Sequence, residues 1–97
     1  MYYLEKNCSV CGDGILGFLR CSDGRTIVVM CEECSSVWLT PDEVEDKYPL
    51  YPEARRFFLL PNSNVSISGG DSGWASLEEI SSAGMGDYAD EGRSYDL

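Results

Sequence analysis

The sequence of 97 residues contains no histidine, so the side chain that most often serves as a general base at neutral pH is missing. The remaining Asp, Glu, Tyr and Cys residues form no recognisable catalytic constellation. Adjacent carboxylates such as Glu32 and Glu33 project in different directions and make a poor acid/base pair. The sequence also has no G-x-x-x-x-G-K-[ST] phosphate loop. We therefore expect a protein that is not an enzyme and has no small-molecule substrate.

Long apolar runs are missing as well. No segment approaches the roughly twenty apolar residues that a membrane-spanning helix needs. Glu5 stands where a secretory signal would require an apolar run. We expect a cytoplasmic protein with no membrane partner.

Basic residues are scarce. Seven Lys and Arg residues face seventeen Asp and Glu residues, which gives a formal net charge of −10, and Arg55 and Arg56 are the only adjacent basic pair. Because phosphate neutralisation by basic side chains supplies most of the non-specific affinity for nucleic acids, this composition disfavours direct DNA or RNA binding. The acidic balance favours a basic protein as the partner.

The cysteines, in contrast, occur at regular spacings in the sequence. Four of the five cysteines form two C-x2-C pairs, Cys8 with Cys11 and Cys31 with Cys34, separated by nineteen residues. This spacing is typical of a four-cysteine zinc site, and in a reducing compartment paired cysteines are more often metal ligands than disulfides. Four thiolates leave no coordination position open, so the expected ion is one structural Zn²⁺. Rubredoxin-like iron, disulfides and dithiol redox chemistry remain as alternatives.

The residues that follow each pair differ. Gly12 supplies the positive φ that a tight turn around a metal needs, whereas Ser35 occupies the equivalent place after the second pair. We expect the Ser35 amide still to contact sulfur. The fifth cysteine, Cys21, is interpreted as a small apolar strand residue, with ligand exchange or an oxidation-sensitive thiol as the alternative.

A hairpin is predicted between the two pairs. Asp23-Gly24 is a strong turn signal between runs rich in branched and aromatic residues, and the returning chain would bring the second pair beside the first. The apolar residues Val37 and Leu39 alternate in the following stretch and predict a third strand.

The order C-x2-C-G, hairpin, C-x2-C and short apolar strand resembles the zinc-ribbon family over about residues 3–40. The resemblance implies a three-stranded antiparallel sheet with two zinc knuckles that hold one Zn²⁺ through Cys8, Cys11, Cys31 and Cys34. The family includes transcription factors, ribosomal proteins and protein-binding modules, so it does not fix a function.

The predicted fold is a small metal-stabilised α+β domain in four parts. Residues 1–40 form the ribbon. Residues 41–61 begin with a helix that starts after the capping box Thr40-x-x-Glu43 and ends near Lys47. They include a second helical turn from Pro52 and pack an aromatic and proline-rich segment on the ribbon. Residues 62–86 form a Ser/Gly loop and a helix that runs from a Ser76 cap, with Glu79 three residues on, to Gly84. Leu77, Ile80 and Ala83 are expected on one face of this helix. Residues 87–97 form a flexible acidic tail.

Partner-binding candidates come from two regions. Aromatic and Arg side chains are enriched at binding hot spots. The candidates are Tyr48, Tyr51, Arg55, Arg56 and Phe57, together with the acidic tail residues Asp87, Asp90 and Glu91.

The leading hypothesis is a zinc-binding protein-interaction module. In its small size and acidic composition the chain resembles small acidic bacterial inhibitors and immunity-type proteins that neutralise basic partners, although no motif carries this resemblance. The alternative is a transcription- or translation-associated zinc ribbon that acts through protein or nucleic-acid contacts.

Overall fold

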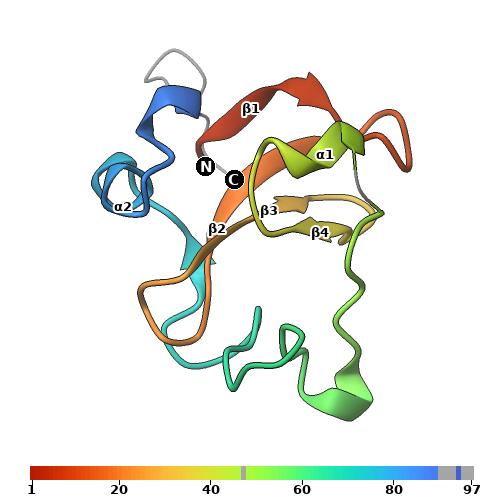
Figure 1. Cartoon of the computed structure of the whole chain (residues 1–97), viewed down its shortest axis with the longest axis vertical. Coiled ribbons are helices and arrows are strands. Elements are labelled where there is room, and N and C mark those ends of the chain that lie inside the picture. The colour runs from red at the N-terminus through yellow and green to blue at the C-terminus, as the bar shows by residue number, and fades with distance from the viewer. Residues whose placement is uncertain (47, 90–93, 95–97) are drawn as a thin grey trace.

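An antiparallel sheet of longer and shorter strands forms the centre of the molecule (Figure 1). The computed structural model describes residues 1–46, 48–89 and 94. Four strands lie in the order β1-β2-β3-β4, and β5 pairs with β2. The strands are β1 (Tyr3–Asn7), β2 (Ile15–Arg20), β3 (Ile27–Cys31), β4 (Val37–Trp38) and β5 (Gly73–Trp74). The helices are α1 (Glu43–Asp46) and α2 (Leu77–Ser82), with 3-10 turns η1 (Ala54–Arg56) and η2 (Gly86–Tyr88).

The predicted hairpin is confirmed. Strands β2 and β3 pair from Leu16 opposite Cys31 to Arg20 opposite Ile27. Asp23 closes the turn between them: its carboxylate accepts hydrogen bonds from the backbone amide of Arg25 at 3.0 Å, the amide of Thr26 at 2.8 Å and the Thr26 hydroxyl at 2.6 Å. The hairpin delivers Cys31 at the end of β3, next to the first cysteine loop.

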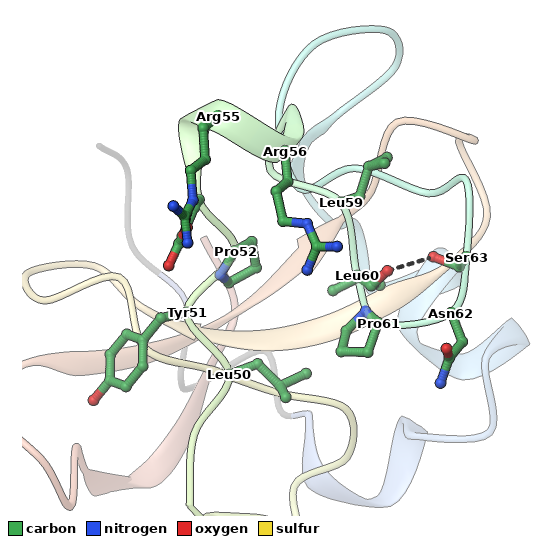
Figure 2. A pocket seen from close by; sticks show the side chains of 11 residues that line it. Leu50, Tyr51, Pro52, Arg55, Arg56, Leu59, Leu60, Pro61, Asn62 and Ser63 are labelled. Atoms are coloured by element: carbon green, nitrogen blue, oxygen red, sulfur yellow. Dashed lines mark hydrogen bonds and ion pairs between the residues drawn. The ribbon is translucent and has the colours of Figure 1, made fainter.

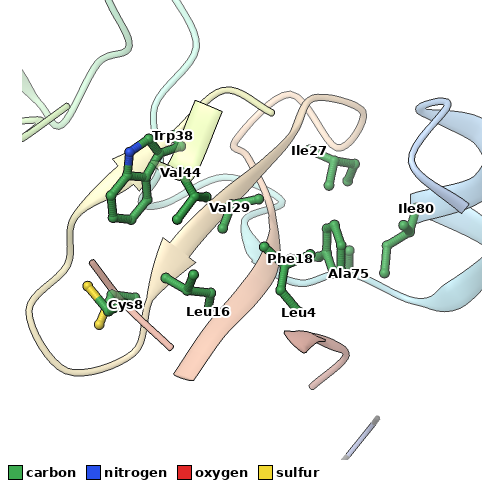
Figure 3. Packing of buried hydrophobic residues seen from close by; sticks show 11 residues of the cluster. Leu4, Cys8, Leu16, Phe18, Ile27, Val29, Trp38, Val44, Ala75 and Ile80 are labelled. Atoms are coloured by element: carbon green, nitrogen blue, oxygen red, sulfur yellow. The ribbon is translucent and has the colours of Figure 1, made fainter. Parts of the chain in front are cut away.

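Both faces of the sheet are buried. Successive strand residues point to opposite faces, so Phe18 and Val29 lie on one face while Leu19 and Val28 lie on the other. We call the first group the metal-side cluster (Figure 3); it consists of Leu4, Cys8, Leu16, Phe18, Ile27, Val29, Cys31, Trp38, Val44, Ala75 and Ile80. We call the second the loop-side cluster; it consists of Leu19, Cys21, Val28, Val37 and Leu60.

The third strand differs in detail from its prediction. We expected alternation with Val37 and Leu39 on the buried side, but β4 ends at Trp38 and Leu39 is exposed. Val37 belongs to the loop-side cluster and Trp38 to the metal-side cluster, because both faces are covered at this strand. The sheet also has five strands rather than three, since β1 and β5 extend it.

Residues 41–61 divide between the two faces. The short helix α1 places Val44 in the metal-side cluster. The chain then crosses to the other face, where Leu50 pairs with Val37 through two backbone hydrogen bonds of 3.0 and 2.7 Å and Leu60 is buried. Lys47, expected at the end of the first helix, lies outside the described residues.

Helix α2 has the predicted capping box. The Ser76 hydroxyl accepts from the Glu79 amide, and the Glu79 carboxylate accepts from the Ser76 amide. Both Glu79 oxygens also accept from Arg20 Nη1 at 2.9 Å, which ties the helix to β2. Ile80 packs in the metal-side cluster, whereas Ala83, expected on the same face, is exposed.

The start of the predicted acidic tail belongs to the folded part. Tyr88 and Ala89 pack against the metal-side cluster, the Tyr88 hydroxyl donates to Asp42, and Ser94 forms an isolated bridge with Tyr2. Asp90 and Glu91 lie outside the described residues. None of the described helices has the length and apolar character that crossing a bilayer requires.

Candidate metal centre

Two loops with matching backbones bring the four cysteines together. The first loop follows β1 and the second follows β3. In the first, the Gly12 amide donates to the Cys8 carbonyl at 3.0 Å; in the second, the Ser35 amide donates to the Cys31 carbonyl at 3.2 Å. Gly12 and Ser35 both have positive φ angles, of 82° and 61°. Ser35 therefore adopts the turn that usually requires glycine, and the Cys31 carbonyl rather than a sulfur accepts from its amide.

The sulfur positions suit a single metal ion. All four Sγ atoms lie within 4.8 Å of one another. Cys8 and Cys34 are 3.6 Å apart, and Cys11 and Cys31 are 3.7 Å apart. A tetrahedral site with metal–sulfur bonds of about 2.3 Å has sulfurs about 3.8 Å apart, whereas a disulfide requires about 2.05 Å. The four cysteines are thus positioned to bind one ion, and each close pair joins one loop to the other.

Backbone amides point at the sulfurs. The Val10 amide donates to Cys8 Sγ at 3.4 Å, the Gly14 amide to Cys11 Sγ at 3.3 Å, and the Cys34 amide to Cys31 Sγ at 3.4 Å. These hydrogen bonds stabilise thiolates, which are the metal-binding form of cysteine.

The thiols titrate differently because their surroundings differ. Burial raises the pKa of Cys8, and it raises the pKa of Cys31 to about 12. Burial also acts to raise the pKa of Cys34, but hydrogen bonds from the Ser36 side chain and backbone, together with those from the Cys31 and Cys8 side chains, outweigh it and lower the pKa of Cys34 to about 6. Cys34 is thus more easily deprotonated than Cys8 or Cys31, and a bound cation would favour the thiolate at all four positions.

Two residues at the site were missed by sequence reasoning. A Cβ atom at Gly14 would lie 2.1 Å from Cys31 Sγ, so only glycine lets the second loop approach the first. Ser36 is completely buried; its hydroxyl lies 3.1 Å from Cys34 Sγ and 3.3 Å from the Tyr51 hydroxyl. The sequence signal for Gly14 is a second glycine close after the first cysteine pair, two positions beyond Gly12. No local sequence pattern marks Ser36.

Cys21 is outside the centre. It is fully buried in the loop-side cluster, as expected for a small apolar residue. Burial, followed by the nearby Asp23 charge, raises its pKa to about 11, which makes it a poor nucleophile.

The structure brings some partner-binding candidates together. Tyr51, Arg55 and Arg56 line an open cleft of about 440 Å³ beside η1 (Figure 2). Tyr48 and Phe57 are exposed but are not among the cleft residues. Asp87 is exposed in η2, next to residues that pack on the opposite, metal-side face.

Comparison of the chain with protein-family models, with curated proteins and with solved structures finds no match. The zinc-ribbon resemblance therefore rests on the cysteine spacing and on the geometry of the four sulfurs.

Proposed function

We propose that the chain is a non-catalytic, zinc-stabilised protein-interaction module that binds a basic protein in the cytoplasm, as an acidic inhibitor or bacterial immunity-type protein would. The observation that carries this proposal is a group of exposed aromatic side chains in residues 48–58. We call residues 48–58 the aromatic segment.

Zinc is the ion that this donor set favours. Four thiolates suit Zn²⁺ in tetrahedral geometry and leave no position for water or substrate. The role of such an ion is structural, because the energy of metal binding becomes energy of folding. Iron binds similar sets, and metal analysis of freshly purified protein distinguishes the two.

The aromatic segment carries apolar area that the fold does not bury. Tyr48 is 97% exposed, Phe57 79%, Tyr51 57% and Phe58 37%. The neighbouring leucines behave differently: Leu50, inside the segment, packs against the loop-side cluster, and Leu60, just after it, belongs to that cluster. The segment is therefore anchored on the sheet by Leu50 and Leu60 and presents its aromatic side chains outward, as binding hot spots do.

Charge favours a basic partner. Three described cations already have acidic neighbours: Lys6 pairs with Glu45 at 3.7 Å, Arg20 with Glu79 at 2.9 Å, and Arg55 with Glu53. The formal net charge of −10 produces a negative field that speeds the approach of a cationic protein.

Affinity capture tests the proposal. The zinc-loaded chain is immobilised on a resin and incubated with cell extract. It is expected to retain a basic protein at low salt and to release it as salt is raised. The double variant Tyr48→Ser/Phe57→Ser should lose this protein. Leu39→Ser, which removes an exposed apolar side chain outside the aromatic segment, should retain it.

Two results would contradict the proposal. One is capture of the same proteins by the wild type and by the double variant. The other is appreciable affinity for DNA or RNA in a low-salt filter-binding assay, which would favour the transcription- or translation-associated alternative.

A further inference from the structure

We propose that the cleft beside η1 binds a short peptide segment of the partner, in which a carboxylate flanked by apolar residues pairs with Arg56. This inference rests on the proposed function and names the chemical group that the cleft recognises.

The cleft has the size and lining of a small binding site. Its volume of about 440 Å³ falls within the range of roughly 300–1,000 Å³ for ligand pockets. Apolar side chains form much of its wall: Leu50, Pro52, Leu59, Leu60 and Pro61. Such walls accept the apolar side chains of a peptide.

The two adjacent arginines of η1 differ in what they contact. Arg55 Nε pairs with the Glu53 carboxylate, so its charge is already compensated. Arg56 forms no side-chain hydrogen bond or ion pair with any described residue. Figure 2 shows its guanidinium extending from η1 into the cleft, toward Leu60 and Pro61. Arg56 is therefore the cation that the cleft offers to a ligand.

The backbone beside the cleft is held in shape before any ligand arrives. Phe57 and Phe58, which lie between the lining residues Arg56 and Leu59, and the lining residue Asn62 have positive φ angles of 56°, 55° and 57°, which side-chain-bearing residues rarely adopt. Three hydrogen bonds hold the first two: Phe58 N to the Glu53 carbonyl at 2.9 Å, Ile67 N to the Phe58 carbonyl at 3.0 Å, and the Ser66 hydroxyl to the Phe57 carbonyl at 2.7 Å. A preformed wall lowers the entropy cost of binding.

Charge complementarity selects the occupant. On a surface with a formal net charge of −10, a carboxylate is repelled at most positions and attracted at an uncompensated guanidinium. Planar guanidinium groups bind carboxylates through two parallel hydrogen bonds. An acidic residue between apolar residues fits both the cation and the walls. The ion pair between this acidic residue and Arg56 would fix the position in which an otherwise basic partner docks on this acidic surface.

Peptide titration of the zinc-loaded full chain tests the inference. The probe is N-acetyl-Leu-Glu-Leu-amide, and its neutral match is N-acetyl-Leu-Gln-Leu-amide. Amide NMR signals of Leu50, Tyr51, Leu59, Leu60, Asn62 and Ser63 should shift with the Glu peptide, and the Gln peptide should bind three- to tenfold more weakly. Arg56→Gln should abolish this preference for the Glu peptide, whereas Arg55→Gln should keep it.

Several outcomes would overturn the inference: equal binding of the two peptides, an unchanged preference in Arg56→Gln, or shifts confined to other residues. Tighter binding of the free acid N-acetyl-leucine than of the Glu peptide would also overturn it, because the ligand would then be a small carboxylic acid. Capture of the basic partner by a wild-type chain that binds neither peptide would sink this inference and leave the proposed function intact. Specific binding of the Glu peptide, together with failure to capture any basic protein, would contradict the proposed function and leave the carboxylate specificity of the cleft intact.

Discussion

At the scale of single residues, the metal centre depends on two small residues beside its four ligands. Gly14 lets Cys31 Sγ come close to the first loop, and Ser36 hydrogen-bonds to Cys34 from a buried position. Neither residue can itself ligate a metal through a thiolate. Each nevertheless determines where a sulfur lies or how it is charged, as residues around metal ligands commonly do.

Gly14→Ala should disrupt the centre. The added Cβ would overlap Cys31 Sγ, and separating the loops should cost about 1–3 kcal/mol in the free energy of unfolding. Urea unfolding and zinc competition with a chelator measure the two effects. Gly73→Ala is the control, because its Cβ would meet only the end of the flexible Arg20 side chain at 3.3 Å. Equal stability of the two variants would contradict this account.

Ser36→Ala should weaken zinc binding about 10- to 100-fold, because the Cys34 thiolate loses its hydrogen bond to the buried Ser36 hydroxyl. Tyr51→Phe keeps Ser36 and should have a smaller effect on affinity. Chelator competition at fixed pH gives both values. An unchanged affinity in Ser36→Ala would show that the hydroxyl does not support the Cys34 thiolate.

At the scale of elements, the β2–β3 hairpin connects the core to the metal centre. It contributes residues to both clusters and ends at Cys31, one of the four clustered cysteines. Asp23 fastens its turn through three hydrogen bonds. The Thr26 side chain, then the Thr26 and Arg25 amides, lower the pKa of Asp23 to about 2.

Asp23→Ala should reduce stability at pH 7 by about 1 kcal/mol, because the turn loses a charged acceptor. The folded-state pKa lies below the ordinary value of 3.8, so the contribution is complete above pH 3.8 and is lost as pH falls toward 2. The stability difference between wild type and variant should therefore narrow over that window. Urea unfolding at several pH values measures it, and a stability difference that stays constant from pH 5 to pH 2 would contradict this account.

Local elements were predictable from the sequence, whereas contacts between distant segments were not. The Asp23-Gly24 turn and the Ser76-x-x-Glu79 cap are formed by near neighbours, and their residue types carry the signal. The pairing of Trp74 with Leu19 joins segments far apart in the chain, and a two-residue strand has no readable period. The four-cysteine site was predictable because metal coordination fixes both residue type and spacing.

At the scale of the whole molecule, two thin clusters and one metal centre share the work of stabilising a small domain. Cys8 and Cys31 belong both to the metal-side cluster and to the four-sulfur group. An ion held by these four sulfurs would be continuous with the core, and its removal should open that core.

Chelation under reducing conditions should unfold the chain and expose Cys21 to alkylation. In the zinc-loaded protein Cys21 should stay unmodified, because it is buried and its pKa is raised to about 11. Intact-mass measurement after iodoacetamide treatment counts the modified cysteines. Cys21→Ala should still bind one zinc ion per chain. Four modifications after chelation, with Cys21 protected, would show that the loop-side cluster survives without the metal.

The placement of the two tryptophans turns the double-sided core into a pair of separate optical reporters. Trp38 lies in the metal-side cluster, and Trp74 packs against the loop-side cluster on the other face. Replacing either indole with phenylalanine leaves a single emitter whose fluorescence describes one layer alone. A stopped-flow mixing trace from each such protein would then reveal which side of the sheet assembles first.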